Sequence, residues 1–375
     1  MIELTLKEIS SSIKTGKTPP SKEFKYYNGE INWYTPGDLT EIKVLNKSSR
    51  TISPLALEQK KAILHKQGTL LVGCIGDIGK LGICVEDCSS NQQLTGIYPI
   101  DEVDVNYLYY WFRGNKRKVE SYANTAVVPI LNNRSLGTIK LPIPPLEEQK
   151  KIAAILDAAD DYRQKTKALI DKYDQLTQSV FLDMFGDPVT NPKGWKKESL
   201  GNHISLINGR AYKKSELLNE GTPVLRIQNL NGGSNWYYSD LELKADKYCY
   251  NGDLLFAWSA SFGPYLFQGN KSIFHYHIWN CKMIGDLNLK FSYYLLQHLT
   301  DQIKSASHGA SMLHMTKSGM EKWEIIIPAE SVQSTFLNRV AQIEKQKRQA
   351  EASLVKAEEL FNSLLQRAFK GELTN

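Results

Sequence analysis

The stretch Leu141-Pro142-Ile143-Pro144-Pro145-Leu146-Glu147-Glu148-Gln149 decides the organisation of the chain, because a weaker copy follows 184 residues later. The copy reads Ile325-Ile326-Ile327-Pro328-Ala329-Glu330-Ser331-Val332-Gln333. The same offset relates Gly68–Leu71 to Gly252–Leu255 and Gly79 to Gly263, and Gly186 matches Gly371 at an offset of 185. Several matches in one register predict an internal duplication.

Each half reads as a mixed segment, a proline-bearing apolar strand, a long helix and a terminal glycine. Apolar residues in the two predicted helices step by three and four, which is typical of a coiled-coil seam, and each helix would be roughly 55–60 Å long. Pro144-Pro145 and Gly186 mark the ends of the first helix. The seam residues are Ile152, Ile155, Ala159, Tyr162, Thr166, Leu169, Tyr173, Leu176 and Val180 in the first helix and Phe336, Val340, Ile343, Lys347, Ala350, Leu354, Ala357, Phe361, Leu364 and Ala368 in the second.

This pattern predicts an α+β fold: two similar mixed α/β domains joined by two long helices that form an antiparallel coiled coil with a pseudo-two-fold axis. The predicted parts are domain one (1–146), a helical spacer (147–187), domain two (188–330) and a C-terminal helical spacer (331–375). The alternative is two unrelated amphipathic helices, each packed on its own domain.

Composition narrows the class of protein. The 375 residues are 42% apolar and 23% charged, which indicates a soluble globular protein of two or three domains. Neither a membrane span nor a signal peptide is apparent, and five cysteines suit a reducing compartment, so we expect a cytoplasmic protein. The net charge of +6 divides as +4 and +3 on the two domains and −3 and +2 on the helices, so a polyanion would meet the domains.

Catalytic motifs are missing. The chain has neither a dinucleotide fingerprint nor a phosphate loop, and the stretch Gly73–Lys80 indicates a tight turn; the functional alternative is that Gly76 and Gly79 approach a phosphate, backed by Lys80. The pair Cys84 and Cys88 lacks a second zinc-ligand pair, and His275 and His277 are better explained as polar contacts or packing than as metal ligands.

These residues resemble the specificity (S) subunit of type I restriction-modification enzymes over essentially the whole chain. The resemblance rests on Gly16-Lys17-Thr18-Pro19-Pro20, Thr35-Pro36-Gly37-Asp38-Leu39, Asn91-Gln92-Gln93, Leu141–Gln149 and Trp258-Ser259-Ala260-Ser261-Phe262-Gly263. His275-Tyr276-His277-Ile278 takes the place of Asn91-Gln92 in the second half, so the two domains should read different sequences.

The resemblance implies a non-catalytic reader of a bipartite duplex DNA target. It further implies two methyltransferase (M) subunits and, where the system also cleaves DNA, endonuclease/translocase (R) subunits. No cofactor is expected on this chain, and S-adenosylmethionine, ATP and Mg²⁺ are expected on the partner subunits.

Candidate DNA contacts follow from phosphate and base-edge chemistry. Phosphate candidates are Lys14, Lys17, Lys43, Lys47, Arg50, Gly76, Lys80 and Lys213. Base-reading candidates are Asn91, Gln92, Gln93, Arg210, Arg226, Gln228, Asn229, His275 and His277. Further expected contacts are Tyr26, Tyr212, Trp258, Ser259 and Ser261. For each charge the alternative is a solvated surface group, and for each amide a satisfied turn.

Two other classes of function stay open at this point. One is a DNA-modifying enzyme, a fused methyltransferase or nuclease, which would turn over without partners. The other is a purely structural coiled-coil scaffold, which would not bind duplex DNA.

Overall fold

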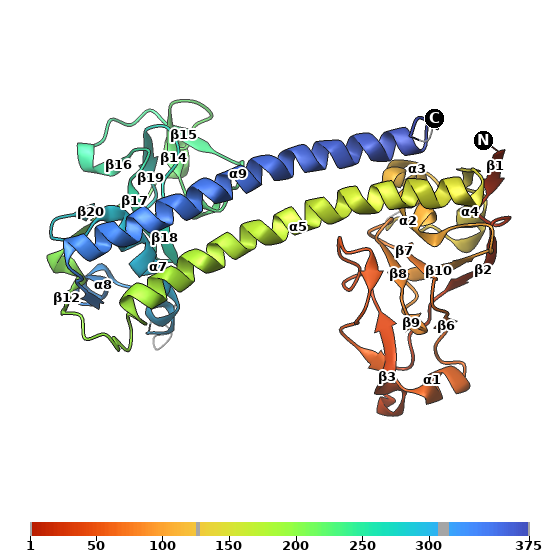
Figure 1. The fold of residues 1–375 in the computed structure, drawn as a ribbon. Helices are drawn as coiled ribbons and strands as arrows, with labels where there is room; N and C mark the ends of the chain where they lie inside the picture. The colour runs from red at the N-terminus through yellow and green to blue at the C-terminus, as the bar shows by residue number, and fades with distance from the viewer. Residues whose placement is uncertain (1, 125–127, 307–314, 374–375) are drawn as a thin grey trace. The chain divides into compact units, whose positions relative to one another are not determined.

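The computed structural model describes residues 2–124, 128–306 and 315–373 (Figure 1). The chain forms two compact units, residues 1–168 with 351–375 and residues 169–350. Each unit contains one α/β domain and a part of both long helices, α5 (Leu146–Phe185) and α9 (Glu330–Ala368). Within the described residues no helix is long and apolar enough to cross a membrane.

The first domain has a five-stranded sheet, a four-stranded sheet and a two-stranded pair. Their strand orders are β2-β10-β7-β8-β4, β5-β3-β9-β6 and β1-β11. The strands are β1 (Ile2–Thr5), β2 (Ser10–Thr15), β3 (Tyr27–Tyr34), β4 (Val44–Leu45), β5 (Thr51–Ile52), β6 (Leu64–His65), β7 (Leu70–Gly73), β8 (Leu81–Cys84), β9 (Cys88–Ser90), β10 (Leu94–Pro99) and β11 (Lys140–Ile143). The helices are α1 (Pro54–Glu58), α2 (Val105–Gly114), α3 (Lys116–Glu120) and α4 (Asn133–Gly137).

The second domain repeats this plan with shorter sheets. Its strand orders are β13-β20-β17-β18, β15-β14-β19-β16 and β12-β21. The strands are β12 (Lys197–Ser199), β13 (Ile204–Asn208), β14 (Thr222–Leu225), β15 (Tyr237–Ser239), β16 (Tyr248–Cys249), β17 (Leu254–Ala257), β18 (Gly263–Leu266), β19 (Ser272–Phe274), β20 (Ile278–Met283) and β21 (Glu324–Ile326). The helices are α6 (Ile227–Leu230), α7 (Leu289–Ala306) and α8 (Lys317–Glu321).

The topology of the two domains is the same where their strands correspond. β10 lies between β2 and β7 as β20 lies between β13 and β17, and the small sheets share one parallel pair, β3 with β9 and β14 with β19. All residues of β7 and of β17 are buried, which explains why both are short continuous apolar runs. The predicted fold class of two similar mixed α/β domains with two long helices is therefore confirmed.

One buried glutamine at the start of each long helix repeats atom by atom. The Gln149 amide nitrogen donates to the carbonyls of Glu102 (3.0 Å) and Pro144 (2.8 Å), and its oxygen accepts from the Asp104 N–H (3.0 Å). Gln333 makes the equivalent three bonds, at 3.1, 2.8 and 2.8 Å, and both side chains are 0–1% exposed. Each glutamine thus ties its helix to the chain just before α2 or α7, and it satisfies backbone groups that burial would otherwise leave unpaired.

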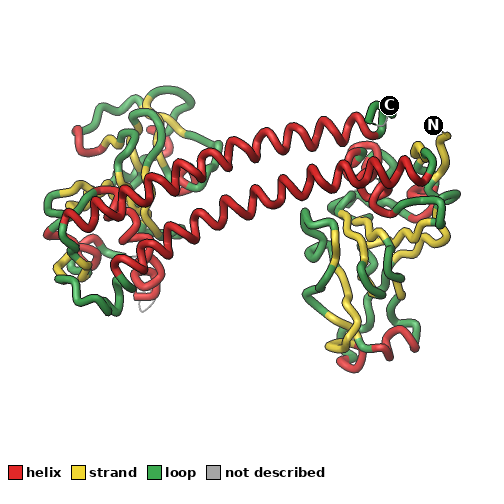
Figure 2. Tube along the Cα trace, in the orientation of Figure 1, coloured by secondary structure: helices red, strands yellow, loops and turns green. Residues whose placement is uncertain are grey.

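The ends of the first long helix agree with the sequence. α5 begins directly after Pro144-Pro145, where a proline can no longer interrupt the helical hydrogen bonds. It ends before Gly186, whose φ of +74° is the left-handed geometry that terminates helices. Each long helix is continuous along its length (Figure 2).

Within each unit the parts of α5 and α9 run antiparallel. In the first unit Arg163 lies 5.3 Å from the Phe361 ring and Lys167 lies 3.8 Å from Glu358. In the second unit Asp174 and Lys347 form an ion pair of 2.6 Å, while the rings of Phe181 and Phe336 lie 5.6 Å apart. Rising numbers on one helix meet falling numbers on the other in both units, as an antiparallel pair requires.

The predicted seam holds for α9 and is partly wrong for α5. Every predicted α9 seam residue is buried or half-buried. On α5, however, Ile155, Tyr162, Leu169 and Leu176 are 38–54% exposed. Their place on the buried face is taken by polar side chains, among them the ion pair of Asp160 with Arg163 (2.8 Å), which the hydrophobic pattern does not register.

His65 predicts a pH dependence for the first domain. Its side chain is 3% exposed, and its Nε2 lies 2.9 Å from the Ser90 hydroxyl. Burial, followed by the charge of Lys14, lowers the pKa of His65 to about 4, below the value of about 6.5 in an unfolded chain. The unfolded chain therefore binds the extra proton between these values, so the stability present above about pH 6.5 is lost as the pH falls towards 4.

At pH 5 we expect the free energy of unfolding of the first unit to be about 2 kcal/mol lower than at pH 8 on account of this residue. Chemical denaturation at both pH values measures the difference. The variant His65→Gln, which keeps a polar partner for Ser90, should lose most of it. An unchanged pH dependence in that variant would contradict the assignment.

Candidate nucleic-acid interface

A three-residue loop, Asn91–Gln93, lies beside Gly16–Thr18 in the first domain. A Cβ at Gly16 would lie 2.3 Å from the Asn91 carbonyl oxygen, a contact that only glycine permits. Asn91 is 7% exposed and donates to the Gln93 side-chain oxygen (2.9 Å), whereas Gln92 is exposed and accepts from the Thr18 hydroxyl. Gln92 is therefore the amide that this loop offers to a ligand, and Asn91 stabilises the turn.

The second domain builds the same arrangement from His275–His277 and Gly209–Arg210. A Cβ at Gly209 would lie 2.2 Å from the His275 carbonyl oxygen. Four backbone bonds of 2.8–3.1 Å recur at equivalent positions: Gly16 N–H to the Leu94 carbonyl and Lys17 N–H to the Ser90 carbonyl, and Gly209 N–H to the Ile278 carbonyl and Arg210 N–H to the Phe274 carbonyl. Arg210 thus corresponds to Lys17, and His-Tyr-His corresponds to Asn-Gln-Gln on one shared backbone.

Two residues of these loops are absent from the predicted contacts. Thr18 holds Gln92 through its hydroxyl, and no sequence signal points to it. Tyr276, which is 40% exposed, stands 184 residues after Gln92, so the offset of the repeat identifies it.

Aromatic side chains surround the second loop. The His275 ring lies 6.5 Å from the Tyr212 ring and 5.0 Å from the His277 ring, and Trp258 donates its indole N–H to the Tyr276 carbonyl (2.9 Å). Burial, followed by positive charge on neighbouring side chains, lowers the pKa of His275 to about 4. His275 is therefore neutral near pH 7, with one ring nitrogen to donate and one to accept, as reading of a base edge requires.

Both arginines of the second domain are held in place by neighbours. Arg210 makes a bidentate ion pair with Glu216 (2.7 and 2.9 Å), which lowers the pKa of that carboxyl to about 2. Arg226 donates to the Asn235 carbonyl (2.8 Å), and its guanidinium lies 4.2 Å from the Tyr237 ring. Fixed guanidinium groups bind planar acceptors with less loss of entropy than mobile ones.

The turn after Arg226 uses other predicted contacts internally. The side chains of Gln228 and Asn229 both donate to the Asn235 carbonyl, at 3.0 and 2.9 Å. Asn229 is 9% exposed and so stabilises the turn, while Gln228 is exposed. Ser261 accepts from the Asn231 amide (2.9 Å), and Ser259 is half-buried.

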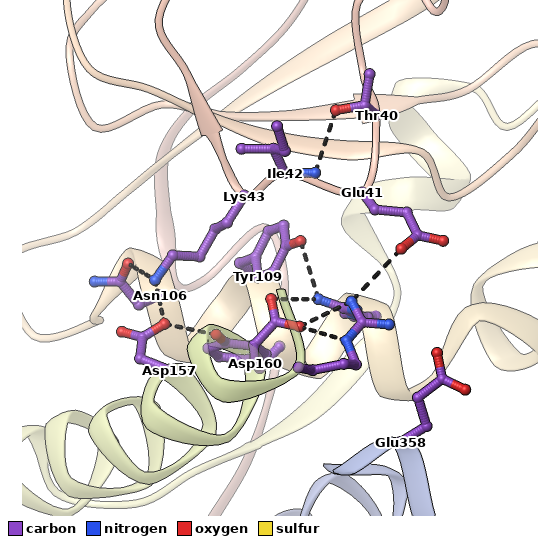
Figure 3. A network of polar contacts seen from close by, with 12 residues as sticks. Thr40, Glu41, Ile42, Lys43, Asn106, Tyr109, Asp157, Asp160 and Glu358 are labelled. Carbon is purple, nitrogen blue, oxygen red and sulfur yellow. Dashed lines mark hydrogen bonds and ion pairs between the residues drawn. The ribbon is translucent and has the colours of Figure 1, made fainter. Parts of the chain in front are cut away.

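Two predicted contacts of the first domain are wrong. Tyr26 is 1% exposed and donates its hydroxyl to Gln59 (2.7 Å), so it belongs to the core. Lys43 binds Asp157 on α5 and the Asn106 side chain (3.0 Å), so its charge is neutralised inside the domain rather than available to a phosphate (Figure 3).

The predicted phosphate cradle of Gly76 and Lys80 is also wrong. The N–H groups of Gly76 and Gly79, which a phosphate would need, each donate to a backbone carbonyl of the same domain (3.0 Å). The Lys80 amine donates to the Pro36 carbonyl (3.0 Å). The stretch is therefore a closed turn, which is the structural alternative for this sequence.

The remaining basic candidates lie at the surface. Lys17 donates to the Lys60 carbonyl (2.7 Å). The exposed candidates, whose contact with phosphate stays a prediction, are Lys14, Lys17, Lys47, Arg50 and Lys213.

Metal ligands do not cluster in the described part of the chain. No group of three or more histidine, cysteine or carboxylate side chains is placed to hold a metal there. Cys84 and Cys88 are buried, with their sulfur atoms 2.9 Å apart. His308 and His314 lie outside the described residues.

Two domains of one topology that present different polar side chains from equivalent loops define a protein with two separate recognition surfaces. The family model for the type I restriction modification DNA specificity domain matches residues 2–172 and 192–354. The chain therefore belongs to this family, as a specificity subunit with two recognition domains and no catalytic activity of its own.

Known relatives agree over most of the chain. The MjaIX specificity subunit of Methanocaldococcus jannaschii is 25% identical over 393 residues, covering 96% of this chain and 90% of that one. The EcoKI specificity subunit of Escherichia coli K12 is 24% identical over 298 residues, covering 69% and 63%. A solved chain from work on the assembly and conformational transition of the type I restriction-modification system shares the fold with a TM-score of 0.64 at 15% identity, over 99% and 98% of the chains. The S subunit from M. genitalium does so with a TM-score of 0.56 at 14% identity, over 98% and 96%.

Proposed function

We propose that each domain reads one half of a bipartite duplex DNA target through its equivalent loop, Asn91–Gln93 in the first domain and His275–His277 in the second. The observation that carries the proposal is the shared backbone of these loops with unlike side chains. One scaffold can then dock on DNA in one way while each domain selects different bases.

Different chemistry on the two loops supports different half-sites. The exposed amide of Gln92 can bond bidentately to adenine in the major groove. The second domain offers a neutral imidazole at His275 and the guanidinium groups of Arg210 and Arg226, which suit the acceptors of guanine. Exposed lysines at the surface would add affinity through phosphates without selecting a sequence.

The reaction itself would come from partner subunits. We propose two methyltransferase (M) subunits that supply S-adenosylmethionine chemistry and, where the system cleaves DNA, endonuclease/translocase (R) subunits that use ATP and Mg²⁺, all in the cytoplasm. Four exposed apolar residues seven apart on α5, namely Ile155, Tyr162, Leu169 and Leu176, support docking of such partners on this helix. We further propose that α5 and α9 set the spacing between the half-sites.

The test is a substitution that separates the half-sites. In the complex with its methyltransferase subunits, Gln92→Ala should weaken discrimination at one half-site by about 1–3 kcal/mol and leave the other unchanged. Methylation rates on targets with single-base changes measure this. Gln67→Ala, an exposed glutamine of the same domain, is the matched control.

Equal loss on every DNA sequence would instead assign Gln92 to the DNA backbone. A complex that fails to bind duplex DNA would favour the scaffold. Turnover by the isolated chain with Mg²⁺ and S-adenosylmethionine would favour the enzyme.

A further inference from the structure

The two domains differ at one edge of the large sheet. In the first domain β4 pairs in parallel with β8, with Val44 opposite Ile83. The second domain ends its sheet at β18, and among the described residues no strand pairs with the outer edge of β18. The register Leu70 to Ile83 and Leu254 to Leu266 makes Leu266 the equivalent of Ile83.

The connecting segments explain the difference. In the first domain β4 belongs to residues 35–50, between β3 and β5. The corresponding connection in the second domain, residues 226–236, is shorter and forms the helix α6 instead of an edge strand. The second domain therefore lacks the chain that would cover β18.

The β4 segment joins the first domain to the long helices of its own unit. The Lys43 carbonyl accepts from the Ile83 N–H (2.8 Å), and the Lys43 amine binds Asp157. Glu41, two residues earlier, lies 2.8 Å from Lys167 (Figure 3). An extended strand with a central lysine is thus the structure that this edge accepts.

A cleft of about 1070 Å³ lies at the corresponding place in the second domain. β18, α7 and the parts of α5 and α9 in the same unit line it. Tyr294 and Glu344 stand 184 residues after Tyr110 and Asp160, and the Tyr294 hydroxyl donates to Glu344 (2.8 Å), as Tyr110 donates to Asp157 (2.6 Å). We call this space the β18 cleft.

The charge of the β18 cleft indicates the kind of ligand. Three carboxylates, Asp174, Asp301 and Glu344, face one cation, Lys347, which is paired with Asp174 (2.6 Å). The remaining negative charge opposes a nucleic acid and favours a basic side chain.

We propose that the β18 cleft binds an extended segment of a partner polypeptide, which adds to β18 as a parallel strand and places a lysine or arginine against Glu344 and Asp301. The Leu266 N–H is the backbone donor for this strand, as the Ile83 N–H is in the first domain. The interaction is separate from DNA reading and does not depend on it.

A steric feature defines the partner sequence further. In the first domain Leu45 packs on Gly82, where an added Cβ would lie 2.6 Å from the Leu45 side chain. The equivalent of Gly82 is Tyr265, whose own side chain fills this space and donates to Asn231 (2.9 Å). The partner residue that corresponds to Leu45 should therefore be small.

The experiment measures hydrogen exchange of the full chain in two settings. The first adds a synthetic peptide with the sequence of residues 39–46 carrying Leu45→Gly, and the second compares the free chain with its complex with the methyltransferase subunits. We expect saturable peptide binding, and at least tenfold slower exchange at residues 262–268 in one or both settings. A peptide with Lys43→Glu, or a chain with Asp301→Lys, should weaken the effect tenfold or more, whereas Asp286→Lys, an exposed control outside the cleft, should not.

The inference is overturned if exchange at residues 262–268 is unchanged both at peptide concentrations of about 1 mM and in the assembled complex. It is also overturned if the Lys43→Glu peptide binds equally well. Either result can occur in a complex that still reads and methylates DNA, so failure here is distinct from failure of the proposed function.

Discussion

Inserting one heptad into both long helices, after Ala168 in α5 and after Ala350 in α9, should lengthen the unspecified spacer of the target by about three base pairs. Seven helical residues add about 10 Å, close to the rise of three base pairs. A whole heptad keeps the same faces of the two helices in contact, so packing within each unit is preserved. The two half-sites themselves should be unchanged, because neither recognition loop is altered.

Mapping of methylated sites in cells that carry the altered chain measures the spacer directly. Insertion into α5 alone is the matched control; it should abolish methylation of both the original and the lengthened target, because the helices then differ in length. An unaltered spacer in the doubly inserted chain would show that the helices do not set the distance.

Replacing Gln149 with alanine should lower the free energy of unfolding of the first unit by about 3 kcal/mol. The change removes three hydrogen bonds and leaves the Asp104 N–H and the carbonyls of Glu102 and Pro144 without this partner in a buried place. Gln333→Ala should cause a similar loss in the second unit, since its three bonds are equivalent.

Denaturant unfolding followed by fluorescence measures both changes, with each variant affecting the transition of its own unit. Gln175→Ala, an exposed glutamine on α5, is the control and should stay within about 0.5 kcal/mol of the unaltered chain. If Gln149→Ala unfolds at the same denaturant concentration as the control, the glutamine does not support the helix start.

Much of the fold could be predicted because duplication leaves marks in sequence order. The offset of 184 aligns strands, glycines and the buried glutamines, and it also pairs the loops Asn91–Gln93 and His275–His277. The ends of α5 were equally predictable, since proline and glycine act through local backbone geometry.

The candidate site was less predictable because exposure depends on distant parts of the chain. The tyrosine Tyr26 is in the core through its contact with Gln59, and Lys43 is neutralised by Asp157, which lies 114 residues away. No local pattern distinguishes such residues from exposed ones.

The sequence by itself determined that this chain is a doubled α/β protein with two long helices, because periodicity and punctuating residues are properties of neighbours in the chain. Only the tertiary structure decided which face of α5 is buried and that the β18 edge is uncovered. Both depend on long-range packing, where a buried ion pair can replace an apolar seam and a shortened connection can remove a strand.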